Sequence, residues 1–77
     1  MINVAKMTTN YPDFHGEGYY NFLMDEDMDK LEAKIENNSH DFSLVGIEEV
    51  DADSIQDVVA MYPNKADLNK ALFDVQV

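Results

Sequence analysis

The sequence predicts an α+β domain, a small three-stranded sheet with helices packed on one face, in the order ββαβαα. Apolar residues alternate with other residues in three stretches, as in strands, and recur every three to four positions elsewhere, as in helices. Because the chain has 77 residues without a repeat or linker, residues 1–77 are expected to form a single acidic domain.

The N-terminal part predicts two strands joined by a long loop. The first strand covers Met1–Met7, where apolar and mixed residues alternate, and the second covers the aromatic stretch Tyr19–Met24. Between them, Thr8–Gly18 is rich in turn-forming residues, which favours a hairpin. A third strand is predicted over Asp41–Val50, with Gly46 as a candidate bulge.

A first helix is predicted from Asp25 onward, because the period of the apolar residues changes there. Spacings of four, three and four place on one helical face the residues Met24, Met28, Leu31 and Ile35. An acidic first turn favours the positive end of the helix dipole. Asn37–His40 is expected to end this helix.

Two further helices follow the third strand. Asp53 is the expected N-cap of the first, with Gln56 three residues later as in a capping box, and Pro63 ends it. Asn64 is the expected cap of the last helix. The two apolar stripes are formed by Ile55, Val58, Val59 and Tyr62, and by Leu68, Ala71, Leu72 and Val75.

The stretch after the second strand has part of a calcium-loop pattern. Asp25, Asp27, Asp29 and Glu36 occupy positions one, three, five and twelve of an EF-hand loop. However, position six, where a glycine makes the sharp turn, is Lys30, and the apolar helical face runs through the whole stretch. We therefore expect no dedicated metal site and no cofactor.

Charge is the strongest signal in the composition. Sixteen Asp and Glu oppose five Lys and no Arg, for a formal net charge of −11. Such a chain repels nucleic acid and anionic membranes, so neither is an expected partner. The absence of cysteine excludes thiolate metal sites. Without an apolar run of spanning length or a secretory signal, a cytoplasmic location is the expectation.

The acidic residues form two groups. On the first predicted helix, Lys30 and Lys34 lie on one flank, and the other flank carries an exposed row formed by Asp25, Asp29, Glu32 and Glu36. The second group straddles the end of the third strand and comprises Glu48, Glu49, Asp51, Asp53 and Asp57. The simpler alternative is that these acids form a solvated rim and cap helices.

Rows of carboxylates on a small rigid scaffold resemble the phosphates of a DNA backbone. In size, charge and absence of Arg the chain resembles the small acidic DNA-mimic proteins of phages and mobile elements. That resemblance is one of type and not of motif. It implies host takeover by inhibiting a basic DNA-binding protein: first an HU-like nucleoid-associated protein, then a restriction or CRISPR nuclease (anti-restriction or anti-CRISPR activity). The two acidic groups would then be the partner-binding residues.

Catalytic residues are not evident, and we do not expect an enzyme. His15 and His40 are the only histidines, and neither belongs to a metal-binding or nucleophile-activating pattern. The glycines Gly16 and Gly18 do not continue into a phosphate-binding loop.

Aromatic residues suggest an alternative function. Tyr11, Phe14 and Tyr19 are candidates for an exposed interface, since aromatics and methionine are typical of protein–protein contacts. The chain would then be an adaptor module that binds through its aromatic and methionine surface. A sheet face left open by the helices would also suit a homodimer.

Overall fold

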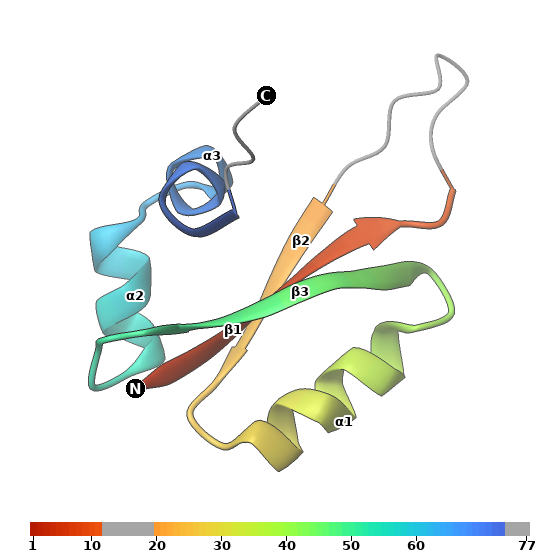
Figure 1. Cartoon of the computed structure of the whole chain (residues 1–77), viewed down its shortest axis with the longest axis horizontal. Helices are drawn as coiled ribbons and strands as arrows, with labels where there is room; N and C mark the ends of the chain where they lie inside the picture. Colours follow the sequence, from red (N-terminus) through yellow and green to blue (C-terminus); the bar gives the residue numbers. More distant parts are fainter. Residues whose placement is uncertain (12–19, 74–77) are drawn as a thin grey trace.

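The computed structural model describes residues 1–11 and 20–73, shown in colour in Figure 1. It confirms the α+β class and the order ββαβαα. The strands are β1 (Ile2–Thr9), β2 (Tyr20–Asp25) and β3 (Phe42–Val50). The helices are α1 (Met28–Asn38), α2 (Ile55–Met61) and α3 (Lys65–Leu68), and a π-helical turn, η1 (Asn69–Phe73), continues from α3.

The N-terminal strand is the centre of the sheet. The strand order is β2-β1-β3, and β1 pairs antiparallel with both neighbours. The register with β3 shifts between Lys6, which is opposite Gly46, and Met7, which is opposite Leu44, so Val45 is an additional residue. A bulge therefore lies beside Gly46, as the sequence predicts.

Both faces of β1 are buried, because its apolar residues occupy both sides of the strand. Ile2 and Val4 join a core cluster with Val50, with Val58 of α2 and with Leu68 of α3. The other face of β1 carries Asn3, Ala5 and Met7, which are also buried.

Helix α1 covers this second face. Asp25 is opposite Asn3 in the sheet and forms an ion pair with Lys34 of α1, so α1 lies on the side of Asn3. Figure 1 shows α1 on one side of the strands and α3 on the other. The helices thus cover both faces, whereas the sequence predicted all of them on one face. The reason is that β1 carries apolar side chains on both of its faces, Ile2 and Val4 on one and Ala5 and Met7 on the other, so both faces are covered.

The first helix begins at Met28, three residues later than predicted. Asp25 and Met24 belong to β2, and Met24 packs against the cluster beneath α2 and α3. Two aspartate turns separate the strand from the helix. The Asp27 N–H donates to Oδ1 of Asp25 at 2.9 Å, and the Asp29 N–H donates to Oδ1 of Asp27 at 2.9 Å. Asp27 is thus the N-cap of α1.

The caps of the later helices are partly as predicted. Asp53 as the cap of α2 is wrong: the cap is Ser54, whose Oγ accepts the Asp57 N–H at 3.2 Å. Asn64 as the cap of α3 is confirmed, because its side chain accepts the Asp67 N–H at 2.9 Å. Because the Ser54 hydroxyl caps α2, the Asp53 side chain is not needed for capping and is exposed to solvent.

Candidate partner-binding surface

Asp25 does not belong to the exposed carboxylate row in which the sequence placed it. Its side chain is only 14% exposed, and its Oδ2 lies 3.1 Å from the Lys34 ammonium. The Asp27 N–H, and after it the Lys34 ammonium, hold the pKa of the Asp25 carboxyl below its ordinary value. Asp25 therefore joins β2 to α1.

The remaining acids of that row keep the predicted arrangement. Asp29, Glu32 and Glu36 are all exposed on α1. At about 100° per residue they share one flank, and Asp29 to Glu36 spans about 10 Å along the axis. Lys34 lies on the other flank and reaches Asp25 at the end of β2. The acidic flank is therefore turned away from β2, toward the β3 side of the sheet.

The second acidic group is exposed as predicted but does not share one face. Glu48 is opposite Val4 and lies on the side of α2 and α3, whereas Glu49 is opposite Asn3 and lies on the side of α1. Asp51, Asp53 and Asp57 are exposed in the turn after β3 and in the first turn of α2.

The two acidic groups converge at one end of the sheet, although they are far apart in the sequence. Asn3 is opposite Asp25 on one side and Glu49 on the other, which places their Cα atoms about 10 Å apart. A shallow pocket of about 290 Å³ is lined by Asp25 of the first group, by its neighbour Glu26, and by Ser54–Gln56 beside the second group. Figure 1 shows the turn after β2 and the turn after β3 at the same end.

Two exposed acids that the sequence analysis left out of its site belong to this end. Glu26 and Asp27 lie in the turn before α1. The sequence predicted them within a helix that begins at Asp25, where they do not belong to the carboxylate row on its flank. We call the combined array the acidic surface. It consists of Glu26, Asp27, Asp29, Glu32, Glu36, Glu48, Glu49, Asp51, Asp53 and Asp57.

Three of the five lysines are engaged by other groups. Lys34 pairs with Asp25, and Lys65 donates to the main-chain carbonyl of Tyr20. Lys6 donates to Oδ1 of Asn69, and its ammonium lies 4.9 Å from the centre of the Tyr20 ring. Over residues 1–11 and 20–73 the pair between Lys34 and Asp25 is the only ion pair, so no lysine neutralises the acidic surface by direct contact.

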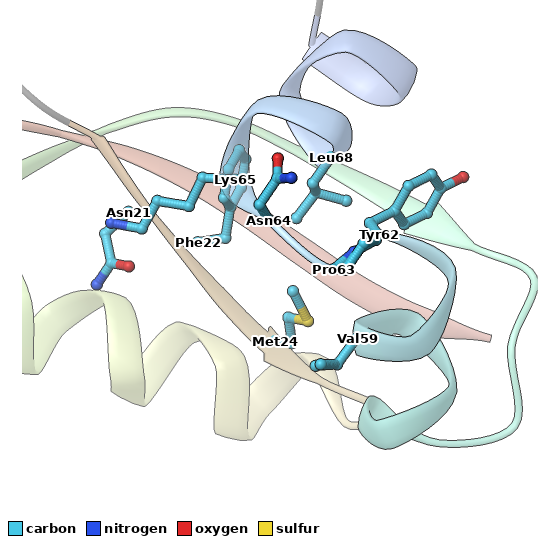
Figure 2. Close-up of a pocket in the computed structure, with 9 residues that line it drawn as sticks. All are labelled: Asn21, Phe22, Met24, Val59, Tyr62, Pro63, Asn64, Lys65 and Leu68. Carbon is cyan, nitrogen blue, oxygen red and sulfur yellow. The ribbon is translucent and has the colours of Figure 1, made fainter.

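An apolar cleft of about 250 Å³ lies between β2 and the α2–α3 segment (Figure 2). Phe22 and Met24 line it from the strand, and Val59, Tyr62 and Leu68 line it from the helical side. Val59 is 53% exposed although it belongs to the predicted apolar stripe of α2. The sequence pattern marked these residues as core, and it could not show that the cleft stays open.

One of the three predicted interface aromatics lies among the described residues. Tyr11 is 61% exposed, as expected of an interface residue, while Phe14 and Tyr19 lie outside the described residues, as does His15. Tyr20 and Phe22 are instead packed, with ring centres 5.4 Å apart, and Phe22 stacks on Phe73 at 5.5 Å.

Among the described residues, no three His, Asp or Glu side chains stand close enough together to hold a metal ion. Within the same ranges, no helix combines the length and apolar character needed to cross a membrane. Comparison with known proteins found no matching family model, no matching curated protein and no matching solved structure.

Proposed function

We propose that this protein is a DNA-mimic inhibitor, which binds and blocks the basic nucleic-acid-binding surface of a host protein. The first candidate target is an HU-like nucleoid-associated protein, and the second is a restriction or CRISPR nuclease. The proposed setting is the host cytoplasm, with the protein encoded by a phage. No catalytic step is involved, because occupancy alone excludes DNA.

The observation that supports this proposal best is that two acidic segments, far apart in the sequence, meet at one end of the sheet, and that the only ion pair among the described residues joins Lys34 to Asp25. A surface selected only for stability would interleave opposite charges, because like charges at short range oppose folding. The three acids on α1 span about 10 Å, which corresponds to the rise of about three base pairs of DNA. Lysine and arginine side chains that bind phosphates could therefore meet carboxylates at similar spacing.

Electrostatic steering would give the complex a defined kinetic signature. The field of a chain with net charge −11 attracts a basic partner before contact and raises the association rate at low salt. Added salt screens that field, so the association rate should fall with ionic strength more than the dissociation rate rises.

The proposal is tested in two stages. The immobilised chain is exposed to host lysate at low and high salt, and proteins released by salt are identified by mass spectrometry. The captured protein is then mixed with labelled duplex DNA, and the chain is titrated in to measure displacement. Capture of DNA-binding proteins that DNA displaces would support the proposal. Capture that is insensitive to both salt and DNA would refute it.

A matched pair of double variants separates local charge from net charge. Glu32→Lys with Glu36→Lys changes two acids of the acidic surface, and Asp41→Lys with Asp67→Lys changes two exposed acids outside it. Both variants shift the net charge equally. Only the first should lose displacement of DNA. Equal losses would mean that net charge, and not the acidic surface, determines binding.

An adaptor function is the second candidate, and the open apolar cleft of Figure 2 favours it. A partner side chain inserted there would contact Val59 and Met24. Under this alternative Val59→Ser should weaken capture from lysate, the bound proteins should not be enriched in DNA-binding proteins, and binding should depend little on salt.

A further inference from the structure

The two outer edges of the sheet differ in how they are protected. On β2, Lys34 donates to the carbonyl of Met24 at 2.6 Å and Lys65 donates to that of Tyr20 at 2.9 Å. These two residues are four apart, so their carbonyls point to the same side of the strand, away from β1. Lysines thus occupy the β2 edge, a common way of preventing further strand pairing.

The β3 edge has no such protection. Among the described strands, β3 pairs only with β1, so no described strand pairs with Ile47 or Glu49 on its other side. It has nine residues, none of them lysine or proline. Leu44 and Val45 are 46% and 55% exposed there. A long edge with exposed apolar residues is the kind of edge that accepts an additional strand.

The register identifies the main-chain groups that this edge offers. The main-chain carbonyls of Tyr20 and Met24 point away from β1. In an antiparallel pair of this kind the main-chain groups of both residues point away from each other, so those of the partners Thr8 and Val4 point toward β3. Val4 is opposite Glu48, which therefore faces inward. Its neighbours in the alternation, Ile47 and Glu49, direct their N–H and C=O groups outward.

A groove runs beside this edge. It has a volume of about 380 Å³ and is lined by Val45–Glu48 of β3, by Leu72 and Phe73 of η1, and by Lys6 of β1, whose ammonium donates to Asn69. A strand added to β3 would place alternate side chains over this groove, which could therefore select among sequences.

The charges around the edge indicate the occupant. Glu48 and Glu49 lie on opposite faces of β3, and the acidic flank of α1 is turned toward the same side of the sheet. A second copy of the chain would bring another net charge of −11 to this edge and be repelled. A segment in which lysine or arginine alternates with apolar residues would place its cations beside Glu49 on one face and its apolar side chains over the groove on the other.

We propose that the β3 edge binds an extended basic segment of the partner as a fourth strand of the sheet. This inference rests on the proposed function and specifies how the target is held: main-chain hydrogen bonds to Ile47 and Glu49, cationic side chains beside Glu49 on the α1 face, and the alternate, apolar side chains over the groove on the other face. Such segments occur in DNA-binding proteins that read DNA with β-ribbons.

The probe is a synthetic peptide of alternating lysine and valine, compared with the same peptide N-methylated at the amides that would face β3. The two peptides have the same charge and side chains, but only the first can donate main-chain hydrogen bonds. In NMR titrations of the labelled chain, the unmethylated peptide should shift the amide signals of Ile47 and Glu49. N-methylation should weaken binding about tenfold, the loss expected for one to two hydrogen bonds.

A pair of variants tests the same edge from the protein side. Glu49→Pro removes the outward N–H and the charge, whereas Glu49→Gln removes only the charge. Because edge strands tolerate proline where the N–H faces solvent, the chain should still fold. Glu49→Pro should weaken the peptide clearly more than Glu49→Gln. If Glu49→Pro does not fold, the comparison of the two peptides decides alone.

Three results would overturn the inference: equal affinity for both peptides, no binding of either, or a homodimer with its β3 amides protected from hydrogen exchange. None of these results would refute the proposed function, which is tested separately by displacement of DNA from the captured protein. Conversely, edge binding of the peptide without any displacement of DNA would leave the β3 site standing and refute the proposed function.

Discussion

The Lys34 ammonium lies 3.1 Å from the Asp25 carboxylate and 2.6 Å from the Met24 carbonyl. One side chain of α1 thus pairs with a charge at the end of β2 and occupies a main-chain acceptor on its outer edge. The same contact leaves only 14% of the Asp25 side chain exposed.

Asp25→Asn should destabilise the protein at neutral pH and have little effect in acid. The folded state lowers the pKa of Asp25 from its ordinary value of 3.8, so its contribution is present above that value and is lost as pH falls through the lower folded pKa. Denaturant midpoints of the wild type and the variant should therefore differ at pH 7 and converge in strong acid. A difference that does not depend on pH would contradict this role.

The same substitution should leave partner binding almost unchanged, because Asp25 is already paired. Glu32→Gln, which removes one exposed carboxylate of the acidic surface, should weaken binding up to about fivefold, as expected for an exposed ion pair. Titration calorimetry at low salt with the captured partner measures both. A larger loss of affinity from Asp25→Asn in a fully folded sample would mean that Asp25 contacts the partner.

Ser54→Ala should destabilise α2 by about 0.5–2 kcal/mol, since the Asp57 N–H loses its acceptor. Asp53→Ala is the matched control at the neighbouring position, which the capping pattern had favoured, and it should change the free energy of unfolding by less than about 0.5 kcal/mol. Urea denaturation followed by circular dichroism distinguishes the two. Equal effects would mean that Asp53 shares the cap.

Both faces of β1 should prove necessary for folding. Leu31→Ala on the α1 side should cost about 2–5 kcal/mol and Val58→Ala on the α2 side about 2 kcal/mol, because both side chains are fully buried. In a domain of this size such losses approach the whole stability of about 3–5 kcal/mol. Val59→Ala, at an exposed position of α2, is the control and should be close to neutral.

The sequence was sufficient for the class, the element order and the Asn64 cap, because these depend on local period and local capping chemistry. It was not sufficient to place Asp25. The spacing from Met24 to Met28 fits a helix, but hydrogen bonds from the N–H groups of Asp27 and Asp29 to aspartate side chains form a turn first. Turn geometry here overrides periodicity.

The faces of the sheet could not be read from the sequence for a different reason. The alternation in Met1–Met7 is weak because Ile2, Val4, Ala5 and Met7 are all buried. That pattern is typical of a strand covered on both sides, but which helix covers which face follows only from long-range pairing, such as that of Asn3 with Asp25 and Glu49. The convergence of the acidic segments depends on the same long-range pairing and was therefore also hidden.

The central place of β1 has a consequence for how the protein is made. Ile2 pairs with Val50, so β1 gains its second neighbour only when a segment some fifty residues further along the chain has been synthesised. Until then one side of β1 has unpaired amides and exposed apolar side chains. Folding must therefore wait for β3 to leave the ribosome, and a nascent chain stalled before that point would be a natural target for chaperones.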